Sequence, residues 1–128
     1  MTGNPIILTV DDAPSIRDLV GTLVSKLGFD GAAAGSGAEA LNLLSDLKRG
    51  GNAPRIIISD LNMPNMNGID FIKAVRSDDK TTPILMLTTM DGSERKTEGK
   101  EAGANGWLVK PISPGSFLAA IKKMASVK

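Results

Sequence analysis

The sequence contains no cysteine and no histidine among its 128 residues. The lack of cysteine excludes disulfides, thiolate zinc sites and cysteine nucleophiles. The lack of histidine excludes an imidazole base, a histidine-bound metal and a phosphohistidine. Catalysis or metal binding must therefore use carboxylates, hydroxyls, lysine and backbone groups, and such oxygen ligands suit hard cations such as Mg²⁺, Ca²⁺ or Mn²⁺.

Aromatic residues and net charge are also low. Aromatics make up 3% of the chain against 41% hydrophobic residues, and 15 basic and 14 acidic residues leave a net charge of +1. A near-neutral chain has no overall positive electrostatic potential that would attract nucleic acid. No apolar run reaches the roughly 18 residues that span a bilayer, and the first residues lack a signal-peptide pattern. We therefore expect a single-domain cytoplasmic protein that binds neither nucleic acid nor membrane.

Short apolar runs alternate with longer segments of helical period along the whole chain. This alternation predicts a parallel sheet with helices on both faces. The expected strands cover residues 6–10, 29–34, 55–59, 84–87 and 107–109, and the expected helices cover 14–27, 36–49, 68–76, 93–102 and the segment after Ser113. The segment between Met90 and Trp107 has only Ala102 and Ala104 as apolar side chains, so its helix should be the least stable element.

Polar residues stand at the carboxyl ends of the expected strands. Asp11 and Asp12 follow the first strand, Asp60 ends the third, Thr88 ends the fourth and Lys110 follows the fifth. Parallel sheets of this kind bind ligands at that edge. Converging carboxylates repel one another unless a cation lies among them. The pattern indicates a hard-metal site with one carboxylate free to react, in which positioning and charge neutralisation would promote phosphoryl transfer.

Four short motifs follow these strand ends in order, and together they resemble the receiver domains of two-component response regulators. The motifs are Val10-Asp11-Asp12, Asp60-Leu61-Asn62-Met63-Pro64 with Gly68, Thr88-Thr89, and Gly106-Trp107-Leu108-Val109-Lys110-Pro111. The resemblance covers essentially the whole chain, so residues 1–128 are expected to form one receiver domain. It implies a flavodoxin-like, doubly wound α/β fold with five parallel strands in the order 2-1-3-4-5.

The resemblance also implies a role for each matching acidic position. Asp60 would be the phosphoacceptor, and the domain would catalyse only its own phosphorylation and dephosphorylation. Asp11, Asp12, Asp60 and the backbone carbonyl of Asn62 would bind Mg²⁺. A sensor histidine kinase would supply the phosphoryl group.

Three further positions match the signalling part of the family pattern. Thr88 and Lys110 would hold the phosphoryl group, Thr88 and Trp107 would form the switch, and the peptide before Pro111 would be cis. The chain, which we expect to be a monomer, is most similar to CheY-like chemotaxis regulators. Its output partner would then be a component of the flagellar motor switch, whereas a phosphotransfer protein, or a role as phosphate sink, is the alternative.

Simpler interpretations exist for individual residues. Asp12 has the residue type that caps helices, an isolated Lys110 would be solvated, and Trp107 would most often belong to the core.

Two other functions fit less well. A phosphatase of the haloacid dehalogenase type needs a second Asp at position 62, where the chain has Asn. A flavodoxin-like nucleotide binder needs a phosphate-binding loop after the first strand, where two carboxylates stand.

Overall fold

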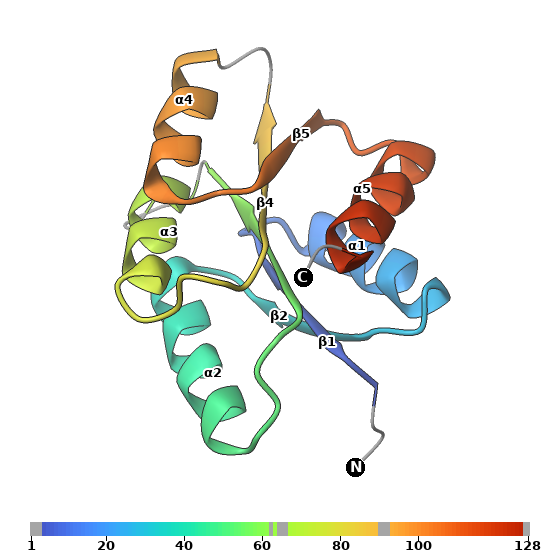
Figure 1. Cartoon of the computed structure of the whole chain (residues 1–128). Helices are drawn as coiled ribbons and strands as arrows, with labels where there is room; N and C mark the ends of the chain where they lie inside the picture. Colours follow the sequence, from blue (N-terminus) through green and yellow to red (C-terminus); the bar gives the residue numbers. More distant parts are fainter. Residues whose placement is uncertain (1–3, 62, 64–66, 90–92, 127–128) are drawn as a thin grey trace.

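The fold is a central parallel sheet covered by helices (Figure 1). The computed structural model describes the backbone of residues 4–61, 63, 67–89 and 93–126. Its sheet has the order β2-β1-β3-β4-β5, which confirms the predicted topology. The strands are β1 (Ile6–Val10), β2 (Asp30–Ala34), β3 (Ile56–Asp60), β4 (Ile84–Thr89) and β5 (Gly106–Lys110). The helices are α1 (Pro14–Lys26), α2 (Gly37–Arg49), α3 (Gly68–Arg76), α4 (Ser93–Ala102) and α5 (Pro114–Ser126).

Alternating side chains of the strands contribute to two hydrophobic layers. Ile56 and Ile58 of β3 belong to the layer beneath α1 and α5, whereas Ile57 belongs to the layer beneath α2 and α3. Figure 1 shows α1 and α5 on one face of the sheet and α2, α3 and α4 on the other. Every residue of β3 is buried, because this strand lies in the middle of the sheet with helices over both faces.

The ends of the helices follow local sequence signals. Pro14 opens α1, and Gly28, just beyond its end, has a φ of +88°, which favours glycine. The Ser36 hydroxyl accepts a hydrogen bond of 3.1 Å from the Glu39 amide at the start of α2. Asn67 accepts an equivalent bond of 2.9 Å from the Asp70 amide in α3. These caps fix where the chain enters each helix.

Helix α4 packs against the sheet through a glycine, whereas most helices do so through a stripe of apolar side chains. Among residues 97–102, only Gly99 is buried. A Cβ atom at Gly99 would lie 1.9 Å from Sδ of Met86 in β4, so the helix lies very close to the sheet at this point. The bounds of α4 agree with the sequence prediction, and its low stability stays a prediction.

The amino-terminal edge of the sheet is tied together by Arg76. Its guanidinium donates to the carbonyls of Gly103, Asp79 and Thr82 at 3.0, 2.9 and 2.7 Å, and to the Asn105 side chain. Burial acts to raise the pKa of Asp79, but hydrogen bonds from the Thr82 side chain and from backbone amides, with the nearby Lys48 charge, lower it to about 2. These contacts hold the loops that lead into β4 and β5.

The helices are short compared with a bilayer. They run from 9 residues in α3 to 13 residues in α1. Within the described part of the chain, none of them combines the length and the hydropathy needed to cross a membrane.

Candidate functional site

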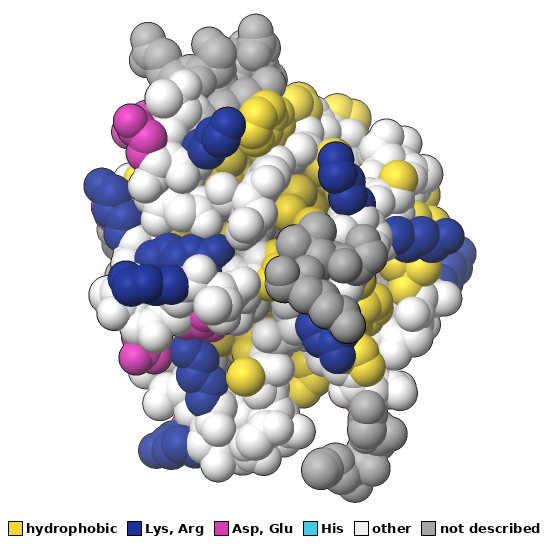
Figure 2. All heavy atoms as spheres, viewed as in Figure 1, with side chains coloured by type: hydrophobic (Ala, Val, Ile, Leu, Met, Phe, Trp, Pro, Cys, Tyr) yellow, Lys and Arg dark blue, Asp and Glu magenta, His cyan; other side chains and the backbone are white. Residues whose placement is uncertain are grey.

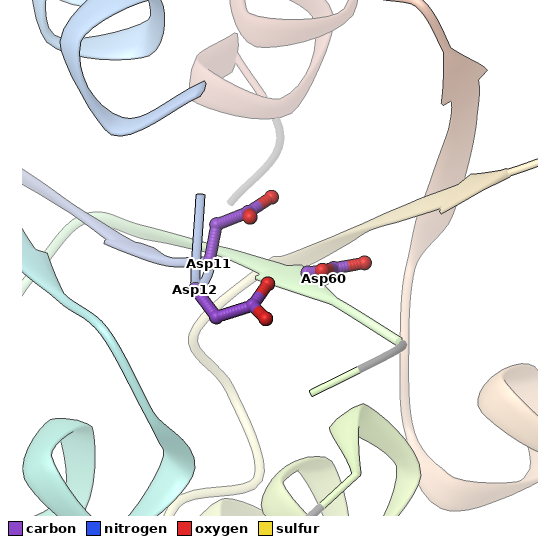
Figure 3. Close-up of side chains that lie close together, drawn as sticks. All are labelled: Asp11, Asp12 and Asp60. Atoms are coloured by element: carbon purple, nitrogen blue, oxygen red, sulfur yellow. The ribbon is translucent and has the colours of Figure 1, made fainter. Parts of the chain in front are cut away.

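Three carboxylates from two neighbouring strands meet at the carboxyl edge of the sheet. Asp11 directly follows β1 and Asp60 closes β3, and both are buried, with 0% and 2% of their surface exposed. Asp12 is exposed to solvent. Carboxylate oxygens of the three residues lie within 4.8 Å of one another. Figure 3 shows the three side chains side by side at the ends of the two strands.

Lys110 reaches this cluster from the end of β5. Its Nζ atom lies 2.9 Å from Oδ2 of Asp11 and 3.3 Å from Oδ2 of Asp60. Burial acts to lower the pKa of Lys110, but the hydrogen bond to Asp11 and the charges of Asp60 and Asp11 outweigh it and raise the pKa. The interpretation of Lys110 as a solvated lysine is therefore wrong, because it is a charged partner of two buried carboxylates.

Hydrogen bonds hold every polar group of Asp11. Its amide donates to the Ala34 carbonyl at 3.1 Å, and its Oδ1 atom accepts from the Ala13 amide at 2.9 Å. Its carbonyl accepts from Nη1 of Arg17 at 2.7 Å. Sequence reasoning missed this role of Arg17, although a basic residue six positions beyond Asp11 in the following helix was a usable signal.

Asp12 does not cap the helix that follows it. The N-cap of α1 is Ala13, and no side chain caps this helix. Within the described residues, the Asp12 carboxylate forms neither a hydrogen bond nor an ion pair. The simpler interpretation of Asp12 as a capping residue is therefore wrong.

Gly68 fixes the backbone around Asp60. A Cβ atom at position 68 would lie 2.2 Å from the Asp60 carbonyl oxygen and 2.7 Å from Cα of Leu61. The Gly68 amide also donates to the Leu61 carbonyl at 3.1 Å. Helix α3 therefore begins directly against the end of β3, which only glycine permits.

The two expected switch residues lie in different environments. Thr88 is buried near the end of β4, with 2% of its surface exposed. Trp107 lies in the edge strand β5 and is 40% exposed, so the interpretation of Trp107 as a core residue is wrong. The Lys110–Pro111 peptide is cis, as predicted. Asn62, the expected backbone ligand, lies outside the described residues.

The residues present suit a divalent cation. Three carboxylates and one ammonium group leave two net negative charges in a largely buried cluster. A divalent ion would balance this charge, and carboxylate oxygens are the ligands that Mg²⁺ prefers. The donor set thus fits Mg²⁺.

Comparisons with known proteins agree with this geometry. A family model, the response regulator receiver domain, matches residues 7–122. Chemotaxis protein CheY1 of Helicobacter pylori is 39% identical over 112 residues, which cover 84% of this chain and 86% of CheY1. The DNA-binding response regulator MtrA of Mycolicibacterium smegmatis is 34% identical over 91% of this chain, which spans only 48% of MtrA.

A solved structure shows the same fold. The chemotaxis protein CheY4 of Vibrio cholerae superposes with a TM-score of 0.84 and 43% identity, covering 95% of this chain and 99% of CheY4. Receiver domains interact with histidine kinases and downstream effectors, and they generally bind Mg²⁺ at an acidic pocket. This chain belongs to the response regulator receiver domain family of two-component systems.

Proposed function

We propose that Asp60 accepts a phosphoryl group from a sensor histidine kinase and that this modification changes binding to an output protein. One observation carries the proposal. The Asp60 carboxylate is buried at the end of the central strand, within 4.8 Å of two further carboxylates and 3.3 Å from a lysine ammonium. The Asp60 carboxylate is thus a fixed nucleophile with one countercharge, Lys110, and with two carboxylates beside it that could hold a cation.

Each side chain has a defined part in the transfer. An Asp60 carboxylate oxygen attacks phosphorus and forms an acyl phosphate, while the bond from phosphorus to the donor nitrogen breaks and the donor keeps that electron pair. Bound Mg²⁺, held by Asp11, Asp12, Asp60 and the Asn62 carbonyl, would reduce the repulsion between the carboxylate and the phosphoryl oxygens.

Lys110 and Thr88 would then hold the product. The Lys110 ammonium already lies beside Asp60, so it can pair with a phosphoryl oxygen after transfer. The Thr88 hydroxyl would move towards the phosphoryl group and donate a hydrogen bond to a second phosphoryl oxygen. This movement of Thr88 would rearrange the segment after β4 together with Trp107.

The output surface would be the face formed by α4, β5 and α5. Exposed apolar side chains, with 40% of Trp107 and 43% of Val109 accessible, lie in β5, and Lys122 and Lys123 are exposed on α5. Figure 2 shows apolar and basic side chains across this side of the molecule, with acidic side chains towards its left margin. Similarity to the chemotaxis proteins CheY1 and CheY4 supports a chemotaxis role. For that role we propose a flagellar motor switch component as the partner.

Phosphorylation is tested with acetyl phosphate and Mg²⁺. Mass spectrometry should show one added phosphoryl group that alkali removes. Asp60→Asn should remain unmodified, whereas Asp70→Asn, which changes an exposed carboxylate in α3, should be modified like the wild type. An unmodified wild-type protein would contradict the proposal, as would modification of Asp60→Asn.

A role as phosphate sink or relay component is the close alternative to motor binding. Beryllofluoride, which mimics a phosphoryl group on Asp60, should increase binding to an isolated motor switch component if the chemotaxis role is correct. Unchanged binding, together with rapid phosphoryl transfer between the chain and a histidine phosphotransfer protein, would favour the relay.

A further inference from the structure

We infer that Arg17 is a positioning residue for the metal-binding carboxylates, because it fixes the peptide group that joins Asp11 to Asp12. The inference rests on the proposed function and extends it to a residue outside the acidic cluster. Nη1 of Arg17 donates to the Asp11 carbonyl at 2.7 Å, a short bond from a charged donor. The carbonyl belongs to the same planar peptide unit as the Asp12 amide.

The two acidic residues are held in different ways. The Asp11 carboxylate is fixed directly, by the Ala13 amide at 2.9 Å and by Lys110 at 2.9 Å. The Asp12 carboxylate has no such contact within the described residues and is exposed. Its direction in the metal-free protein therefore depends on the backbone that carries it. Fixing the Asp11–Asp12 peptide is the means by which the fold aims Asp12 towards Asp60.

The surrounding chain leaves room for the Arg17 guanidinium. A Cβ atom at Gly35, just after β2, would lie 3.3 Å from Nη1 of Arg17, which is tighter than ordinary contact. The Gly35 amide is itself held by Oε1 of Glu39 at 2.8 Å. The guanidinium thus lies between the end of β1, the first turns of α1 and the loop after β2. A side chain at position 35 would press on it.

Arg17 has two separable effects on the cluster. Its hydrogen bond sets the orientation of the Asp11–Asp12 peptide. Its positive charge weakens the repulsion among the carboxylates whatever that orientation is. Lysine keeps the charge and lacks the planar fork that reaches the carbonyl. Salt at about 1 M weakens the charge effect, although less for partly buried groups, and leaves a structural hydrogen bond largely unaffected. Arg17→Lys and a salt series therefore distinguish positioning from simple charge.

The test is calorimetric titration of the full chain with Mg²⁺ alone. Partners that orient metal ligands typically change affinity by about 10-fold or more. We expect Arg17→Ala and Arg17→Lys each to weaken Mg²⁺ binding by about tenfold at both low and high salt. Arg55→Ala should bind Mg²⁺ like the wild type, because it removes the same charge from an exposed position before β3, at the opposite edge of the sheet.

A second readout needs no metal. The Asp12 amide resonance of the metal-free protein should shift in both Arg17 variants and stay in place in Arg55→Ala. Thermal unfolding without Mg²⁺ checks that each variant is folded. If Arg17→Ala does not fold, Gly35→Ala replaces it: this variant keeps the charge, crowds the guanidinium and should also weaken Mg²⁺ binding.

Three outcomes would overturn the inference. These are wild-type affinity in Arg17→Ala, wild-type affinity in Arg17→Lys, and a deficit that disappears at high salt. Failure of the proposed function is distinguishable, because then the wild-type protein itself would neither bind Mg²⁺ nor accept a phosphoryl group.

Discussion

Asp12 should destabilise the protein without metal and stabilise it with metal. Its carboxylate oxygens lie within 4.8 Å of those of Asp11 and Asp60, and it has no compensating contact among the described residues. At that distance two like charges repel by about 1 kcal/mol in a water-like medium. Asp12 forms one such pair with Asp11 and one with Asp60. After the reduction by salt and by the Lys110 charge, the net repulsion energy is about 1 kcal/mol. Asp12→Asn should therefore raise the free energy of unfolding of the metal-free protein by about 1 kcal/mol.

Magnesium should make the wild type more stable than Asp12→Asn. At a Mg²⁺ concentration about 100 times its dissociation constant, binding adds about 2.7 kcal/mol to wild-type stability. Asp12→Asn loses a ligand and should gain far less. Urea unfolding of both proteins with and without Mg²⁺ measures all four values, and the stability ranking should invert between the two conditions.

A control separates the cluster from general charge effects. Asp18→Asn removes an exposed carboxylate from α1, outside the cluster, so it should change neither the metal-free stability nor the gain from Mg²⁺. The reasoning is refuted if Asp12→Asn is less stable than the wild type without metal. It is equally refuted if Mg²⁺ stabilises Asp12→Asn as much as the wild type.

Three further results are expected. Gly68→Ala should lower the free energy of unfolding by about 3 kcal/mol in urea titrations, since its Cβ would meet the Asp60 carbonyl at 2.2 Å, and wild-type stability would contradict this packing. Asp79→Asn should cost up to about 2 kcal/mol near neutral pH, and the difference from the wild type should fade as the pH drops from 3.8 towards 2. The lowered pKa of Asp79 stabilises the fold fully above that range, in part within it and not below it. In hydrogen exchange, amides of α4 should exchange faster than those of β3, whereas equal protection would contradict the prediction of a weak helix.

The fold was largely predictable because its signals are local. The three consecutive isoleucines of β3 and the capping pair of Ser36 and Glu39 act within a few residues, so they mark elements before any tertiary contact is known. Once the strands were placed, the common edge of a parallel sheet brought Asp11 and Asp60 together. The convergence of the acidic side chains followed from topology.

The contacts within the site were less accessible from sequence. Whether Lys110 turns inward or remains solvated depends on rotamers at the end of β5, and the position of Trp107 depends on β5 being an uncovered edge strand. The Arg17 contact depends on the path of the chain past Gly35, which periodicity does not report. These features arise from three-dimensional packing of segments that are distant in sequence.

Arg76 joins loops at the amino-terminal edge of the sheet, whereas the carboxylates lie at the opposite, carboxyl edge. The hydrogen bonds of Arg76 that hold the loops are thus separated in space from the acidic cluster that would react. The exposed loop of residues 51–53, which leads into β3 from the non-reactive side, is accordingly a suitable place for an inserted peptide tag or reporter. Such an insertion would leave the acidic cluster intact, and the domain could then be linked to a second protein without disturbing its phosphoryl chemistry.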